Sequence, residues 1–177
     1  MWTLSVCIPV YNSDVRALVA QLCAQIDLET GAQIDLILLD DASNAITKAR
    51  NQFAHPKVRV FELSQNIGRA KIRNAFLKYT NADYLLFIDG DSTIQAPTFI
   101  ANYKNFLDEH PNTKVLVGAS CYQLNKPELK YRLRWRYSTQ RESLSFAARS
   151  KQPTHGFKTN NFVVAREILE QHPFDEN

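Results

Sequence analysis

Residues 83–92 read Asp-Tyr-Leu-Leu-Phe-Ile-Asp-Gly-Asp-Ser, an apolar run that leads into two carboxylates on either side of a glycine. The run is short and rich in aromatic and branched side chains, which predicts a strand buried in a sheet. Open α/β sheets bind ligands at the carboxyl ends of their strands, where Asp89 and Asp91 would lie. Two carboxylates there suit Mg²⁺ or Mn²⁺ carrying a diphosphate. Because Asp and Gly are also ordinary turn residues, this tripeptide alone leaves both interpretations open.

Strand and helix signals alternate along the rest of the chain. Further strands are predicted at residues 4–10, 34–39, 58–63 and 115–117, and helices at 15–26, 44–53, 69–79 and 97–109. This alternation predicts an α/β fold with a mostly parallel, Rossmann-like sheet flanked by helices on both faces. No linker or repeat divides the chain, so we expect a single domain over residues 1–177.

Composition places the chain among compact soluble domains. It has 177 residues, of which 45% are hydrophobic and 22% charged, enough for one sizeable core. We expect a cytoplasmic protein, because no apolar run reaches the length of a membrane span and the N-terminus does not resemble a signal peptide. The three cysteines have no metal-ligand spacing, so neither a disulfide nor a zinc site is expected.

Polar residues follow three of the predicted strands. They are Tyr11-Asn12 after the first, Asp40-Asp41 after the second and Asp89-Gly90-Asp91 after the fourth. The carboxyl ends of parallel strands meet at one edge of the sheet, so these residues should lie close together. A carboxylate after the second strand can accept hydrogen bonds from a ribose or a base imide. The pattern therefore predicts a nucleotide lying across the sheet edge.

Five segments, in this order, resemble the family-two glycosyltransferases of the GT-A fold: residues 5–12, 39–43, 66–74, 87–91 and 159–166. The resemblance implies an enzyme that moves a sugar from a nucleoside diphosphate sugar to a glycan or a lipid-linked glycan. It also implies inversion at the anomeric carbon and assistance from Mn²⁺ or Mg²⁺, and UDP is favoured over GDP. Residues 1–120 would then form the nucleotide-sugar-binding half, and residues 121–177 part of the acceptor-binding half.

The resemblance also implies roles for particular residues. Base and ribose contacts fall to Pro9, Tyr11, Asn12, Asp40 and Asp41, and contacts to the ribose and diphosphate to Asn66, Gly68 and Arg73. Metal and phosphate contacts fall to Asp89, Gly90 and Asp91, and contacts near the donor sugar to Asn160 and Asn161, with His155 as a lesser candidate. The alternatives are a surface position on an amphipathic helix for Arg73 and a simple turn for the Asn pair.

The catalytic base is missing from the matching positions. An inverting displacement needs a carboxylate that takes the proton of the acceptor hydroxyl. In the family this base belongs to a Glu-Asp pair that follows a stretch like Phe174-Asp175-Glu176-Asn177, the last four residues here. We therefore expect the base beyond Asn177, in a longer enzyme of which this chain is a truncated form. Asp175 and Glu176 are weaker candidates.

Positive charge is concentrated in residues 126–158, which carry nine Lys or Arg and two Glu, against twelve and sixteen in the remainder. Such a segment suits a donor diphosphate, an anionic acceptor or an acidic membrane surface, and is most often only a solvated face. Aromatic residues lie among its arginines, as in proteins that bind single strands, although we expect no nucleic acid partner. A helix at 127–150 is expected to dock its stripe of Leu129, Leu133 and Tyr137 onto the domain's core, with peripheral contact to the inner face of the membrane as the alternative.

Other classes of protein fit less well. Residues 89–93 also match the Asp-x-Asp-x-Thr pattern of haloacid-dehalogenase-like phosphatases, but no acidic pair follows downstream as that family requires. The glycine-rich loop of a nucleotidyltransferase is missing, since residues 1–30 contain no glycine. The main alternative is a non-catalytic module that binds a nucleotide sugar or a polyanion.

Overall fold

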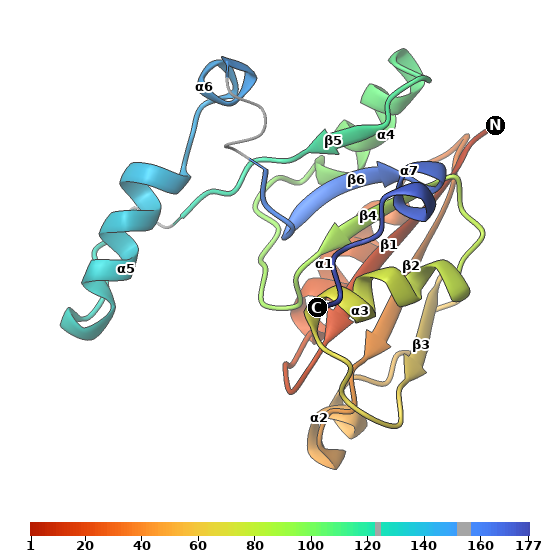
Figure 1. Ribbon diagram of the computed structural model, residues 1–177, viewed down its shortest axis with the longest axis horizontal. Helices are drawn as coiled ribbons and strands as arrows, with labels where there is room; N and C mark the ends of the chain where they lie inside the picture. Colours follow the sequence, from red (N-terminus) through yellow and green to blue (C-terminus); the bar gives the residue numbers. More distant parts are fainter. Residues whose placement is uncertain (123–124, 152–156) are drawn as a thin grey trace.

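The computed structural model describes residues 1–122, 125–151 and 157–177. Its centre is a six-stranded sheet in the order β3-β2-β1-β4-β6-β5 (Figure 1). The strands are β1 (Thr3–Val10), β2 (Gln33–Asp40), β3 (Val58–Glu62), β4 (Tyr84–Ile88), β5 (Val115–Val117) and β6 (Asn161–Ala165). Strands β1 to β4 run parallel to one another, whereas β6 runs antiparallel to both β4 and β5. The predicted mostly parallel sheet is confirmed.

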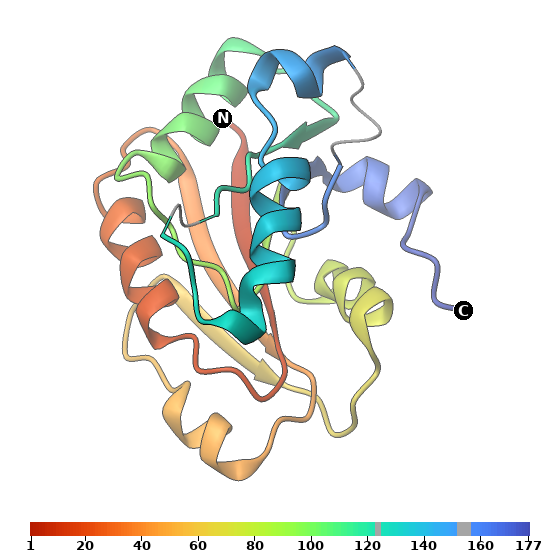
Figure 2. The same ribbon diagram turned by 90° about the vertical axis from the view of Figure 1, so that its left-hand side faces the viewer.

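Helices cover both faces of the sheet, as predicted (Figure 2). α1 (Arg16–Ile26) and α4 (Phe99–Glu109) lie on one face, and α3 (Arg69–Ala75) and α7 (Arg166–Gln171) on the other. The other α-helices are α2 (Ala45–Arg50), α5 (Arg132–Tyr137) and α6 (Phe146–Lys151). Because side chains alternate along a strand, each strand contributes to two cores. Val6 and Leu86 pack in the core that contains α1 and α4, and Cys7 and Phe87 in the core that contains α3 and α7.

The sequence prediction missed β6 and α7. The apolar run 162–165 lies within the resembling segment 159–166 and is absent from the predicted strands, although its length and composition suit a buried strand. In the structure it inserts between β4 and β5, so the short β5 pairs with β6 and not with β4. This insertion places Asn160 and Asn161 beside the carboxyl end of β4.

The expected helix at 127–150 is broken. A 3₁₀ turn (Leu129–Tyr131), α5 and a π-helical turn (Ser138–Glu142) follow one another, and α6 begins only at Phe146. We call residues 129–142 the arm, which projects away from the sheet (Figure 1). The expected docking of its apolar stripe is wrong, because Leu129 and Leu133 are 77% and 84% exposed. Across the part of the chain that the structure describes, no helix is long and apolar enough to cross a membrane.

Candidate functional site

The loops after β1 and β2 are tied together by side chains. Asn12 has a left-handed backbone (φ 50°), and its N–H donates to Ser43 Oγ at 2.8 Å. Its side-chain Oδ1 accepts hydrogen bonds from the backbone N–H and the amide of Asn44, which also caps α2. Pro9 lies at the end of β1 and is partly buried, while the ring of Tyr11 is 55% exposed. The structure therefore leaves Tyr11 open to a ligand, whereas Asn12 holds the two loops together.

Both carboxylates after β2 are buried and contact backbone N–H groups. Asp40 Oδ1 accepts a hydrogen bond from the N–H of Ser43 at 2.7 Å, which closes the turn after β2. The two oxygens of Asp41 accept from the N–H groups of Ile67 and Gly68, at 2.7 and 3.0 Å. The contact of Asp41 with residues 67 and 68 could not be predicted from the sequence, because a backbone N–H group is present in almost every residue and has no sequence signature. Asp41 thus supports the loop before α3, and its predicted contact with a base stays a prediction.

The loop at residues 66–68 reaches the sheet edge through Asp41. Asn66 Nδ2 donates to the Asp41 carbonyl at 3.2 Å. Gly68, the residue before α3, has φ +85°, a conformation that side chains with a Cβ rarely adopt. An added Cβ at Gly68 would meet no atom within 4 Å, so the glycine serves the backbone conformation and not close packing.

Arg73 forms a buried ion pair with Asp89. Its Nη2 lies 2.5 Å from Asp89 Oδ1, and the two side chains are 5% and 19% exposed. The exposed side chain of Arg69 also approaches this carboxylate, with its Nη2 3.5 Å from Asp89 Oδ2. Burial raises the pKa of Asp89, and Arg73 opposes this rise, while burial lowers the pKa of Arg73. The alternative of a surface position for Arg73 is therefore wrong, because the guanidinium lies inside and fixes the carboxylate.

Gly90 and Asp91 form the outer part of the same turn. A Cβ on Gly90 would lie 3.1 Å from Val15 Cγ1 and 3.3 Å from the Pro9 carbonyl oxygen, so a larger residue would force these neighbours to shift, and glycine lets the turn pack closely against the end of β1. Asp91 is exposed and has no hydrogen bond or ion pair with any described residue. One carboxylate of the pair is thus held in place by Arg73, and the other is free to bind a ligand.

These two carboxylates fit a diphosphate-bound metal better than a metal held by protein alone. Residues 1–122, 125–151 and 157–177 contain no group of three or more His, Cys, Asp or Glu side chains that could hold a metal ion. Mg²⁺ in particular is commonly bound through one or two carboxylates, with phosphates and waters as its other ligands. Asp91 and Asp89 can supply these one or two carboxylates, with a diphosphate and waters as the remaining ligands.

Asn160 and Asn161 have different surroundings. Asn161 Oδ1 accepts a hydrogen bond from Tyr103 Oη at 2.6 Å, and its Nδ2 donates to the Ala119 carbonyl, so this side chain joins β6 to α4 and the segment after β5. Burial raises the pKa of Tyr103. Asn160 lies nearer the carboxylates, because its carbonyl accepts the N–H of Asp89 at 3.2 Å. His155 lies outside the described residues.

The C-terminal residues pack against α3. Phe174 forms backbone hydrogen bonds with the Asn74 side chain, and its ring lies 5.9 Å from the Arg73 guanidinium carbon. Glu176 accepts a hydrogen bond from Asn74 at 2.8 Å. Asp175 is exposed, and hydrogen bonds from Asn177 lower its pKa. A low pKa makes Asp175 a poor proton acceptor.

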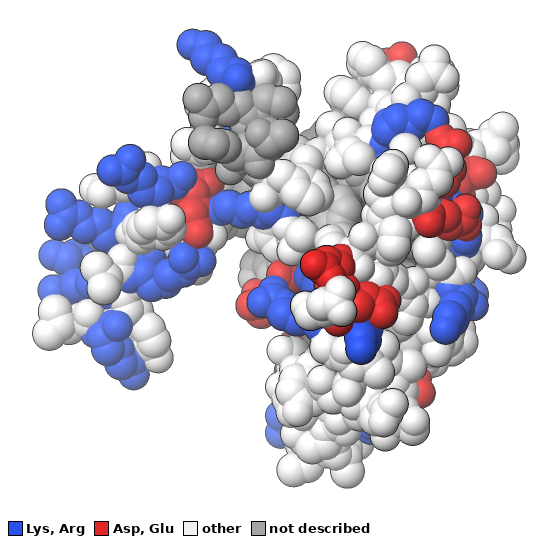
Figure 3. Space-filling view, in the orientation of Figure 1, with Lys and Arg blue, Asp and Glu red and all other residues white. Residues whose placement is uncertain are grey.

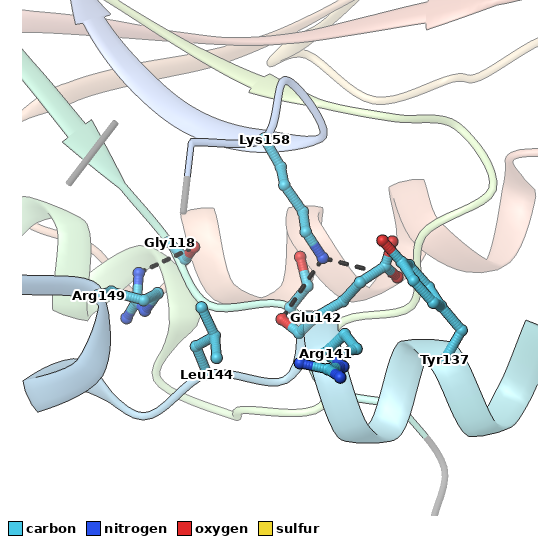
Figure 4. Close-up of a pocket in the computed structure, with 8 residues that line it drawn as sticks. Gly118, Tyr137, Arg141, Glu142, Leu144, Arg149 and Lys158 are labelled. Atoms are coloured by element: carbon cyan, nitrogen blue, oxygen red, sulfur yellow. Dashed lines mark hydrogen bonds and ion pairs between the residues drawn. The ribbon is translucent and has the colours of Figure 1, made fainter. Parts of the chain in front are cut away.

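A separate cavity of about 230 Å³ lies between the end of β5 and the arm (Figure 4). Glu142 lines it and accepts a hydrogen bond from Tyr122 Oη at 2.5 Å. The same carboxylate forms ion pairs with Arg134 Nη1 at 3.1 Å and Lys158 Nζ at 3.7 Å. Burial raises the pKa of Glu142, but the hydrogen bond from Tyr122 and the two cations outweigh it and hold the pKa below its ordinary value. Glu142 is therefore an ionised link between the arm and the segments beside β5 and β6.

Curated proteins with similar sequences include a teichoic acid biosynthesis protein and an N-acetylglucosaminyltransferase. The chain is 29% identical over 187 residues to the minor teichoic acid biosynthesis protein GgaB of Bacillus subtilis (strain 168), covering 99% of this chain and 19% of GgaB. It is 30% identical over 125 residues to the poly(ribitol-phosphate) beta-N-acetylglucosaminyltransferase TarS of Staphylococcus aureus (strain Mu50), covering 66% of this chain and 21% of TarS. The chain thus spans about a fifth of the length of these relatives.

Solved structures share the fold. The mannosyltransferase PcManGT of Pyrobaculum calidifontis, solved with GDP-Man and Mn²⁺, matches with a TM-score of 0.70 at 20% identity, over 98% of this chain and 48% of that one. Glucosyl-3-phosphoglycerate synthase of Mycobacterium tuberculosis, solved with Mn²⁺ and UDP-Glc, matches with a TM-score of 0.64 at 19% identity, over 98% and 59%. The model of the family described as glycosyl transferase family 2 matches residues 5–172. Since this match spans nearly the whole chain, the protein belongs to glycosyltransferase family 2, a family of transferases with the GT-A fold.

Proposed function

We propose that this chain is the donor-binding part of an enzyme that transfers a sugar, with inversion, from a nucleoside diphosphate sugar to a glycan or a lipid-linked glycan. The observation that carries the proposal is the arrangement at the end of β4, where Asp91 is free beside an Asp89 fixed by Arg73. Solved proteins of the same fold contain UDP-Glc or GDP-Man together with Mn²⁺, which supports a nucleotide sugar as the ligand.

The nucleoside would lie across the ends of β1 and β2. Tyr11 offers an exposed ring that can stack on a base, and Asp41 offers a buried carboxylate with both oxygens already oriented by backbone N–H groups. Each carboxylate oxygen has a further lone pair, so Asp41 can accept the imide N–H of a uracil while it supports the loop. We favour UDP over GDP as the nucleotide.

The diphosphate would lie over Gly68 and Gly90, with Asp91 as the direct ligand of Mn²⁺ or Mg²⁺ and Asp89 as the second. When bound, the metal supplies Lewis-acid stabilisation of the negative charge that develops on the departing diphosphate. Arg73 opposes the rise that burial causes in the pKa of Asp89, and the 2.5 Å ion pair orients its carboxylate. Arg69, 83% exposed and 3.5 Å from Asp89, is placed to contact a phosphate oxygen.

The proton acceptor is assigned to neither C-terminal carboxylate. Asp175 is exposed and has a lowered pKa, and Glu176 is held by a hydrogen bond from Asn74. We propose that the base belongs to a part of the enzyme outside these 177 residues.

The arm is proposed to contact the inner face of the membrane in a cytoplasmic enzyme. Leu129 and Leu133 are almost fully exposed and lie among the cationic residues 130, 132, 134 and 136. Apolar side chains between cations are typical of helices that lie on anionic lipid surfaces. Vesicles of phosphatidylglycerol should therefore sediment the protein, and the variant Leu129→Ser/Leu133→Ser should remain in solution.

The donor site is tested by calorimetric titration with UDP, GDP and their sugar conjugates, each with and without Mn²⁺. We expect one nucleoside diphosphate to bind in a metal-dependent manner, and Asp91→Ala to abolish this binding. The matched control is Glu109→Ala, which removes another exposed carboxylate, at the end of α4. Both variants should melt at the wild-type temperature, because neither side chain has a partner among the described residues.

Two results would count against the proposal. Unaltered nucleotide binding by Asp91→Ala would remove the metal role of this residue. Failure of every nucleotide to bind to folded protein at millimolar concentration would remove the donor site. Donor binding without sugar transfer by the whole enzyme would favour the non-catalytic binding module.

A further inference from the structure

The cavity beside the arm carries more positive than negative charge. Arg141, Arg149 and Lys158 line it, and Glu142 is the one carboxylate among its lining residues (Figure 4). On the face shown in Figure 3, Lys and Arg side chains gather over the arm, which supplies Tyr137, Arg141 and Glu142 to the cavity lining. The cavity thus lies at the inner end of a positively charged surface.

Glu142 cannot neutralise all three cations. It is already shared between Lys158 and Arg134, a residue of α5. Arg149 donates only to the backbone carbonyls of Val117 and Gly118, at 2.9 and 3.2 Å, and its Nε is buried with no hydrogen-bond partner in the described structure. Arg141 is exposed and has no described partner. Two guanidinium groups therefore line the cavity without an acidic partner.

A short chain of hydrogen bonds connects the cavity to the donor site. Ser120, which lines the cavity, accepts a hydrogen bond from Asn160 Nδ2 at 3.2 Å. The Asn160 carbonyl in turn accepts the N–H of Asp89. The cavity is therefore joined to the carboxylate pair through Asn160, and none of its lining residues comes from β1, β2 or the loops that follow them.

We propose that this cavity binds a phosphate or carboxylate group of the acceptor, so that the acceptor of the reaction is an anionic glycan. The inference rests on the proposed function, since it assumes that a sugar donor binds at the carboxylate pair. Guanidinium groups form charge-assisted, often bidentate hydrogen bonds with both kinds of oxyanion. The volume of about 230 Å³ suits one charged group and its immediate surroundings, because pockets that enclose a drug-sized ligand measure roughly 300–1,000 Å³.

The test is a titration of the whole chain that is monitored by ¹⁵N-edited nuclear magnetic resonance. The probes are glycerol 3-phosphate and glucuronate, which separate a phosphate from a carboxylate, with glycerol and glucose as their uncharged counterparts. The signals to follow are the backbone amides of Gly118, Ser120 and Leu144, which line the cavity. At least one of the two anions should shift these signals in a saturable manner, and neither uncharged probe should.

Arg141→Gln should weaken binding of the anion roughly tenfold, the effect of losing about one charge-assisted hydrogen bond. The matched control is Arg136→Gln, which removes an exposed cation without a described partner from the same arm but outside the cavity lining. The control should change the affinity less than about twofold. Neither replaced side chain has a described partner, so both variants should remain folded.

The two proposals fail in different ways. A titration with UDP and Mn²⁺ on the same samples should give equal affinities for wild type, Arg141→Gln and Arg136→Gln. If the wild type itself does not bind the nucleotide, the proposed donor site is refuted. Normal nucleotide binding with no saturable anion binding, or with equal weakening by both Gln variants, would overturn the anion site alone.

Discussion

Replacing Arg73 by Met should destabilise the protein by leaving Asp89 buried without its partner. The Nη2 of Arg73 lies 2.5 Å from Asp89 Oδ1, and the two side chains are only 5% and 19% exposed. Removing one member of a buried ion pair costs about 3–5 kcal/mol, because the remaining charge stays desolvated. Arg69 lies 3.5 Å from the other oxygen and solvent reaches part of the carboxylate, so we expect roughly 2–3 kcal/mol.

The size of this loss should depend on pH. Burial already raises the pKa of Asp89, and Arg73 is the largest influence that lowers it, so the pKa rises further in the variant. A carboxyl group with a raised folded-state pKa loses stability as the pH rises through that value. The variant should therefore be most impaired at about pH 7, and the difference from wild type should shrink toward about pH 4, where Asp89 is protonated.

Urea unfolding followed by circular dichroism, at both pH values, measures these differences. Asp89→Asn, alone and combined with Arg73→Met, completes a double-mutant cycle. We expect the combined variant to be more stable at pH 7 than Arg73→Met, because it no longer buries an unpaired charge. If the loss is equal at the two pH values and Asp89→Asn restores nothing, the ion pair is not the source of the stability, and only the packing of Arg73 matters.

Three further predictions concern the residues that shape the sheet edge. Asp41→Asn should cost about 1–3 kcal/mol in urea unfolding, since an amide nitrogen would face one of two backbone N–H donors; an unchanged midpoint would contradict the loop-supporting role. Gly118→Ala should lower the melting temperature, because its Cβ would lie 2.2 Å from both Tyr103 Oη and Asn161 Nδ2; an unchanged melting temperature would contradict this close packing. Burial raises the pKa of Tyr103 above its ordinary value, so the folded protein should lose stability as the pH rises above about 10, where an exposed tyrosine ionises. Tyr103→Phe should flatten this alkaline loss of stability, and an equal loss in both proteins would contradict the prediction.

Much of the sheet and of its edge could be predicted from local patterns. Short apolar runs marked β1 to β5, and the residues after β1, β2 and β4 converge because parallel strands end at one edge. Cys7 and Cys23 are free and buried as small hydrophobic residues, whereas Cys121 is exposed. The insertion of β6 between β4 and β5 could not be predicted in this way, since strand order depends on pairing between distant residues, from Ile88 with Asn161 to Tyr84 with Ala165.

Other site features depend on tertiary contacts that have no sequence signature. Asp41 contacts backbone N–H groups that any residue could supply, and Asn161 is held by Tyr103 from α4. Sequence alone also favoured docking of the apolar stripe on the arm, because apolar stripes usually pack inward. The stripe remains exposed among arginines, so its few leucines do not bring the arm onto the core.

The most direct measurement is electron paramagnetic resonance of Mn²⁺ mixed with the protein, with and without UDP or GDP. The described residues offer the free carboxylate of Asp91 and the fixed carboxylate of Asp89, and a diphosphate would supply the other ligands. We therefore expect the free Mn²⁺ signal to fall when protein and one of the two nucleotides are both present, beyond what that nucleotide binds alone, and this further fall to vanish in Asp91→Ala but not in Glu109→Ala. A fall that persists in Asp91→Ala would contradict a metal-bound diphosphate at the end of β4.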